Sequence, residues 1–221
     1  MSAGNTNTAA RNNYLARGAD AAQPYFNGAV DSFKIYTGAL TNGEITAMQP
    51  ANIAPTLAAI TNRVIGAGIT LVITNSASDA DQPWQTLTFS LPNAPSGATI
   101  NTNTGVFTWR PTVSQANTTN TVQVKVADNG TPSLSATQSF LITINPITAP
   151  TLTIAALTGG QFTFQINGDP GPDYSIQTST NLVDWSTIFT TNSPGLPFNW
   201  TDPNPAQQNM LFYRILLGPW P

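Results

Sequence analysis

The stretch Thr121-Val122-Gln123-Val124-Lys125-Val126 decides the fold, because its valines alternate strictly with polar residues. Period-two alternation is typical of a β-strand with one buried face and one solvated face. Working outward, three further segments show strand patterns: Thr86–Leu91, Val106–Trp109 and Phe140–Ile144. The turn signals Asn103-Thr104-Gly105 and Asp128-Asn129-Gly130 fall between them. Several short strands within residues 52–146 predict a β-sandwich.

The C-terminal part predicts a second, smaller sandwich. Alternation returns in Phe162–Ile166, Tyr174–Gln177 and Phe212–Ile215, after a proline-marked joint at Pro146 to Pro150. The expected fold class is therefore all-β, with two tandem β-sandwich domains at residues 51–147 and 148–221.

Residues 1–50 carry the one helix-like signal of the chain. Thr41 and Glu44 have the spacing of a capping box, and Ala29–Tyr36 before them is expected to be a strand. One strand and one helical turn cannot form a domain alone. We therefore expect this segment to pack on something else or to be mobile.

Each of the three parts has a family resemblance. The run Tyr25–Tyr36 resembles the closing strand of LamG-like, concanavalin A-type jelly rolls, and Asn13–Gly18 is similar to the strand before it. This resemblance implies that residues 1–50 are a jelly-roll remnant and that the chain is a fragment. In the middle part, Asn52–Pro55, Ser78–Asp81, Ala94–Ile100, Thr104–Pro111 and Val126–Pro132 resemble bacterial cadherin-like and putative-Ig repeats. Thr178–Trp185 and Phe212–Arg214 resemble small C-terminal sandwich modules of large exported bacterial proteins, loosely similar to fibronectin type III, whose activity is undefined.

Composition excludes several function classes. The chain has no His and no Cys, so imidazole bases, thiolate nucleophiles and the usual zinc sites are absent. A net charge of −3 without basic clusters argues against nucleic acid and anionic membranes. No apolar run approaches about 18 residues, so no membrane-spanning helix is expected. The start Met1–Thr6 does not resemble a signal peptide. The low-charge, Thr/Asn-rich composition favours an extracellular or cell-surface bacterial protein, with its export signal upstream of this chain.

Asp79, Asp81 and Asp128 are the best candidate metal ligands. The cadherin-like resemblance implies that carboxylates at these positions meet at one end of the sandwich and bind Ca²⁺, which prefers six to eight hard oxygens. The chain departs from the family pattern at Ile65–Gly68, where an acidic residue is usual, and at Asn145–Thr148, which lacks the acidic motif between repeats. The alternative is that the three aspartates cap turns through hydrogen bonds to the backbone.

The remaining candidates have simpler interpretations. Asp169 and Asp173 could serve as a glycosidase pair, but a tight Pro/Gly-rich turn explains them better. Glu44 is best explained as a helix cap. Among the aromatic residues, Trp109, Trp185 and Tyr213 lie within strand patterns and are expected in cores. Trp84 and Trp220 lie in loops and are the candidates for ligand contact.

Two functional hypotheses follow. The first is a non-catalytic adhesion, spacer or carbohydrate-contact fragment of a large exported protein, with a polysaccharide or a cell-surface protein as partner. The second is a calcium-dependent hydrolase that acts on an ester, lactone or glycoside through a metal-activated water. The sequence leaves the ligand and the oligomeric state open.

Overall fold

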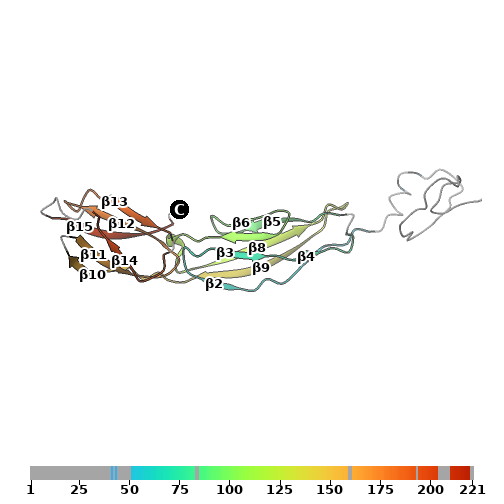
Figure 1. The fold of residues 1–221 in the computed structure, drawn as a ribbon. Coiled ribbons are helices and arrows are strands. Elements are labelled where there is room, and N and C mark those ends of the chain that lie inside the picture. Colours follow the sequence, from blue (N-terminus) through green and yellow to red (C-terminus); the bar gives the residue numbers. More distant parts are fainter. Residues whose placement is uncertain are drawn as a thin grey trace, which may run out of the picture. The chain divides into compact units, whose positions relative to one another are not determined.

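The computed structural model describes residues 41, 43, 51–82, 85–158, 161–192, 194–203 and 210–219. The predicted jelly-roll remnant of residues 1–50 lies outside this set, apart from Thr41 and Gly43. Ala51–Pro221 form one compact unit, which is built from β-strands and one short 3-10 turn, Val113–Gln115, in its described part (Figure 1). The predicted all-β class is confirmed. No helix among the described residues is long and apolar enough to cross a membrane.

The first sandwich consists of two larger sheets and one strand pair. One sheet has the order β2-β9-β8-β5, the other has the order β3-β7-β6, and β1 pairs with β4. Only the pairing of β2 with β9 is parallel among these described ladders. The strand bounds are β1 Thr56–Leu57, β2 Arg63–Ile65, β3 Leu71–Thr74, β4 Ala77–Ser78, β5 Thr88–Asn93, β6 Thr99–Ile100, β7 Val106–Trp109, β8 Thr118–Ala127 and β9 Ser135–Ile144.

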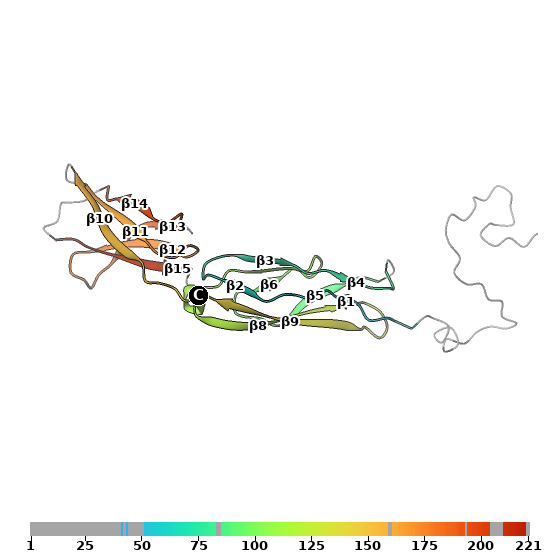
Figure 2. The same ribbon diagram turned by 90° about the horizontal axis from the view of Figure 1, so that it is seen from below.

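The long hairpin of β8 and β9 organises this sandwich. The two strands pair without interruption from Thr118 opposite Ile144 to Ala127 opposite Ser135, and they lie side by side in both views (Figures 1 and 2). Val122, Val124 and Val126 all point inward and are fully buried. They share a core with the aromatic and aliphatic side chains Phe89, Phe107, Trp109, Phe140, Ile142 and Ile144. The alternation read from the sequence is therefore the alternation between core and solvent.

The second sandwich has two three-stranded sheets. Their orders are β10-β11-β14 and β13-β12-β15. The bounds are β10 Thr151–Thr158, β11 Gln161–Asn167, β12 Asp173–Ser179, β13 Ser186–Thr191, β14 Phe198–Thr201 and β15 Phe212–Gly218. Phe164, Ile166, Tyr174, Ile176 and Trp200 form a separate core between these sheets. The division of residues 51–221 at residue 147 stays a prediction, although each sandwich has a core of its own.

A buried acid–phenol contact lies beside this second core. The Tyr213 hydroxyl donates to Asp202 Oδ2 over 2.6 Å, and Asp202 is only 5% exposed. Burial, reinforced by the hydrogen bond to Asp202 and its negative charge, raises the pKa of Tyr213 far above its ordinary value. Tyr213 therefore stays a neutral donor that satisfies a buried carboxylate.

Strands with strong alternation match the sequence expectation, and weakly patterned ones were missed. Val106–Trp109 is observed as predicted, and β8, β9, β11, β12 and β15 extend beyond their predicted cores. Strands such as β2 and β13 have no clear alternation, because β2 is a three-residue strand and β13 is an exposed edge strand. The expected core position of Trp185 is wrong, because the residue is only half-buried and lies just before β13.

Phe107 provides a direct test of the first core. Its ring is fully buried and packs edge-to-face on Phe140 with a centroid separation of 6.0 Å. We expect Phe107→Ala to lower the free energy of unfolding by about 3–5 kcal/mol, through lost burial and the cavity left behind. Urea denaturation followed by circular dichroism measures this change. Val72→Ala is the control, since Val72 is 57% exposed and its truncation should cost no more than about 0.5 kcal/mol.

Candidate functional site

The three predicted aspartates belong to one polar network at an end of the first sandwich. Asp79 and Asp81 lie in the turn after β4, and Asp128 follows β8 directly. Two amide side chains connect the turns. Gln85 Nε2 donates to Asp81 Oδ2 over 3.3 Å and to Asn52 Oδ1 over 2.7 Å, while Asn52 Nδ2 donates to Asp128 Oδ2 over 3.1 Å. No sequence pattern marks Gln85 as part of a site, and Asn52 belongs to a stretch that carries only the family resemblance.

Asp128 is the structural centre of its own turn. It is 5% exposed, and its Oδ1 accepts hydrogen bonds from the backbone N–H groups of Gly130 and Leu134 over 3.0 and 2.9 Å. Burial is the largest influence on its pKa and acts to raise it, but the hydrogen bonds from Leu134, Gly130 and Asn52 together lower the pKa below 3.8. Both carboxylate oxygens already have N–H donors. Asp128 is therefore engaged as a turn former.

Asp79 has one oxygen in use and one without a donor. Its Oδ1 accepts from the backbone N–H of Asp81 over 2.8 Å, which closes an Asx turn. Its Oδ2 is buried, and no donor among the described residues reaches it; the same is true of Gln85 Oε1. A buried acceptor without a donor costs about 1–3 kcal/mol. These two oxygens are therefore the atoms of the network that most need a water molecule or a cation.

Within the described ranges, no group of three or more acidic, His or Cys side chains converges closely enough to hold a metal. Asp79, Asp81 and Asp128 thus share a hydrogen-bonded network, but they do not surround a common point as a three-carboxylate cage. Calcium binding stays a prediction. The candidate contact residues Trp84 and Trp220 lie outside the described residues.

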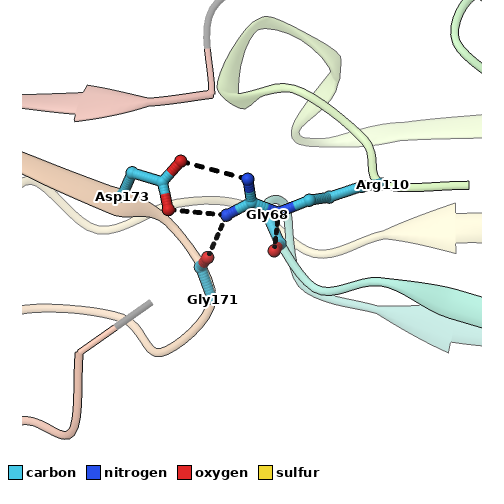
Figure 3. A network of polar contacts seen from close by, with 4 residues as sticks. All are labelled: Gly68, Arg110, Gly171 and Asp173. Atoms are coloured by element: carbon cyan, nitrogen blue, oxygen red, sulfur yellow. Dashed lines mark hydrogen bonds and ion pairs between the residues drawn. The ribbon is translucent and has the colours of Figure 1, made fainter. Parts of the chain in front are cut away.

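Asp169 and Asp173, which were predicted to share one turn, have two different structural roles. Asp169 accepts a hydrogen bond from the backbone N–H of Thr148, which agrees with a turn residue. The turn interpretation of Asp173 is wrong, because Asp173 begins β12 and pairs with Arg110 of the first sandwich. The guanidinium Nη1 donates to Asp173 Oδ2 over 3.0 Å, and Nη2 donates to Oδ1 over 2.7 Å (Figure 3).

The same arginine also binds backbone on both sides of the joint between the sandwiches. Arg110 Nε donates to the carbonyl of Gly68 over 2.7 Å, and Nη2 donates to the carbonyl of Gly171 over 3.3 Å (Figure 3). A small cavity of about 200 Å³ lies beside this contact, lined mainly by Ala67, Ile69, Pro146, Ile147, Pro170 and Pro172. The joint was expected near Pro146 to Pro150, but no sequence pattern indicates the pairing of Arg110 with Asp173, because the two residues are 63 positions apart.

The lowered pKa of Asp128 leads to a pH-dependent prediction. A carboxylate whose pKa is lower in the folded chain stabilises the fold above its unfolded pKa, and this contribution is lost as the pH falls through the folded pKa. We expect Asp128→Asn to lower the melting temperature at neutral pH, with a deficit that shrinks as the pH falls below 3.8. Thermal unfolding from pH 7 to pH 2 measures it. A deficit that is constant over this range would contradict the assignment of Asp128 as a charged hydrogen-bond acceptor.

The family comparison agrees with the architecture of the first sandwich. Residues 50–145 match the family model described as Putative Ig domain, and among curated proteins none matches the chain. Similar solved structures include a nucleoside hydrolase-related protein from Saccharophagus degradans associated with carbohydrate metabolism, with 21% identity over 43% of this chain and 26% of that one, at a TM-score of 0.35. The human CDH23 EC21-23 structure has 16% identity over 52% of this chain and 45% of that one, at a TM-score of 0.36. The chain therefore spans less than half the length of either structure. Residues 50–145 are therefore similar to an Ig-like domain.

Proposed function

We propose that this chain is a non-catalytic spacer or adhesion module of an exported protein, in which two β-sandwiches act as one mechanical unit. The observation that carries this proposal is the joint between the sandwiches. A spacer must transmit orientation from one domain to the next, so it needs contacts that resist bending and twisting at the junction. Ig-like repeats are typical of extracellular proteins, and an extracellular or cell-surface location is part of the proposal.

The ion pair at the joint contributes more to the relative orientation of the two sandwiches than to the stability of the fold. The side chains of Arg110 and Asp173 are 32% and 22% exposed, so solvent screens much of their attraction. A pair of this exposure contributes on the order of 1 kcal/mol. The two parallel N–H···O bonds nevertheless require the planes of the guanidinium and the carboxylate to be aligned. The pair therefore favours one orientation of the second sandwich relative to Arg110.

Two glycines allow the backbones to approach closely at the same place. Gly68 has a positive φ of 76°, and a Cβ placed on it would lie 2.6 Å from the carbonyl carbon of Gly171. Gly171 has a φ of 108°, and its own Cβ would lie 2.7 Å from the carbonyl oxygen of Ala67. Only glycine fits both the conformation and the contact. The joint is thus a backbone-to-backbone contact with little room for relative movement.

Gly68→Ala tests whether this contact couples the sandwiches. We expect the variant to push the sandwiches apart, so that they reorient independently and unfold in separate steps. Backbone ¹⁵N relaxation measures the rotational correlation time of each sandwich, which should be equal in the parent chain and different in the variant.

Gly97→Ala is the matched control for this experiment. Gly97 has a φ of 83°, but its Cβ would meet only Trp109 atoms at 3.9 Å, so the substitution adds backbone strain without touching the joint. Different correlation times in the parent chain, or equal ones in Gly68→Ala, would contradict the spacer proposal.

Calcium binding is the second candidate function, and the two donor-less oxygens favour it. Asp79 Oδ2 and Gln85 Oε1 are hard acceptors of the kind that Ca²⁺ prefers, and both belong to the network that includes Asp81. Asp128 fits poorly as a ligand, because N–H donors occupy both of its oxygens. A site here would be held by Asp79, Gln85 and Asp81, with backbone carbonyls and water completing the shell. The ion would then add rigidity at the Asp79 end of the first sandwich.

A calcium titration decides this candidate. If Ca²⁺ binds only the folded chain, it must raise the melting temperature relative to EDTA, by an amount that corresponds to about 2.7 kcal/mol at one hundred times the dissociation constant. We expect Asp79→Asn to abolish the shift and Asp184→Asn, which removes a carboxylate from the second sandwich, to leave it unchanged. The absence of a shift at millimolar Ca²⁺ would leave the aspartates as turn formers. Ca²⁺-dependent turnover of an ester, lactone or glycoside would instead overturn the non-catalytic proposal.

A further inference from the structure

The outer face of the β13-β12-β15 sheet carries a row of polar side chains that neither core uses. Gln177 on the central strand lies opposite Thr187 on one side and Arg214 on the other. Residues directly opposite in a ladder project on the same face. Trp185, just before β13, completes the row by stacking on Arg214. We call Trp185, Gln177, Thr187 and Arg214 the arginine row.

The guanidinium of Arg214 is held in one orientation. Its Nε donates to Gln177 Oε1 over 2.8 Å, and its central carbon lies 4.2 Å from the centroid of the Trp185 ring. The supporting residues are themselves fixed, since Gln177 Nε2 donates to Thr187 Oγ1 over 2.9 Å and Trp185 Nε1 donates to the carbonyl of Leu182 over 3.1 Å. The entropy cost of ordering a long arginine side chain is thus met before any ligand arrives.

The charge of Arg214 is not neutralised within the described part of the chain. Arg110 has Asp173 as its partner, whereas Arg214 is exposed and, among the residues that the structure describes, has no carboxylate within ion-pair distance. Asp184, next to Trp185 in sequence, instead accepts a hydrogen bond from Asn181 Nδ2 over 2.7 Å. Both terminal nitrogens of Arg214 therefore remain as donors, in the fork arrangement that matches a carboxylate.

We propose that the arginine row binds the carboxylate of an acidic polysaccharide, that is, of a polymer of uronic-acid residues. Charge complementarity defines the anion, because the free fork of Arg214 matches two carboxylate oxygens. The neighbouring groups match the rest of a sugar, since the Thr187 hydroxyl and the next row, Thr190 and Ser175, offer hydrogen bonds to sugar hydroxyls along the sheet. The chain has a net charge of −3, so attraction to a polyanion must come from this local arrangement. This binding goes beyond the spacer role and does not depend on the joint.

Calorimetric titration of the full chain with oligogalacturonate tests the proposal, with a neutral oligogalactan as the matched ligand. We expect oligogalacturonate to bind and the neutral oligogalactan not to bind. Added salt should weaken the binding, as for any exposed ionic contact. Arg214→Gln should reduce the affinity at least about tenfold, as expected for the loss of charge-assisted hydrogen bonds. Arg214→Lys keeps the charge but loses the forked pair of donors and the Nε hydrogen bond. Its affinity for oligogalacturonate should therefore lie between those of the parent chain and Arg214→Gln.

Arg63→Gln is the control for net charge, because it removes a half-buried arginine that lies on the first sandwich. Arg63→Gln should leave the affinity for oligogalacturonate unchanged. Gly68→Ala, which disrupts the joint, should also leave it unchanged, so the spacer proposal and the binding proposal can fail independently of each other. Equal binding of oligogalacturonate by the parent chain and Arg214→Gln would overturn the proposal, as would no binding at all. Equally tight binding of poly-glutamate would overturn the assignment to sugar, because it would show recognition of any polycarboxylate.

Discussion

The uninterrupted ladder between β8 and β9 is the constraint on which the rest of the first sandwich depends. Ten residues on each strand fix one register, and that register sends Val122, Val124 and Val126 to the same face. A slip by one residue would expose all three valines and bury Thr121, Gln123 and Lys125 instead. The second sheet packs on that apolar face through Phe107 and Trp109.

The polar end of the sandwich shows how a chain with few charges satisfies buried carboxylates. Asp128 is bonded by backbone N–H groups and by the amide of Asn52, and Gln85 extends the network to Asp81. Neutral amides connect two loops here without the cost of burying a second charge. The network is incomplete at Asp79 Oδ2 and Gln85 Oε1, so a water molecule or an ion bound at these two oxygens would stabilise this end of the sandwich.

The two arginines of the joint and of the outer sheet illustrate opposite uses of the same side chain. Arg110 donates to a carboxylate and to two backbone carbonyls, so its charge is neutralised at the contact between the sandwiches (Figure 3). Arg214 is oriented by a neutral amide and an aromatic ring, so its charge remains available. This difference in partners, more than the exposure of either residue, separates a structural cation from a candidate binding group.

The sequence by itself determined the all-β class and the strongly alternating strands, because side-chain direction along a strand repeats every two residues. It also left turn capping by Asp79, Asp81 and Asp128 as the alternative to a metal site, since Asp favours turns through hydrogen bonds to the backbone. It could not show that Asn52 and Gln85 connect those turns, that Asp173 pairs with Arg110, or that Trp185 lies outside the core beneath Arg214. The contacts of Asn52 with Asp128 and Gln85, of Arg110 with Asp173 and of Trp185 with Arg214 join residues 29 to 76 positions apart. Only the tertiary structure decides them, because partners far apart in sequence are set by which strand ends and faces the folded sheets bring together.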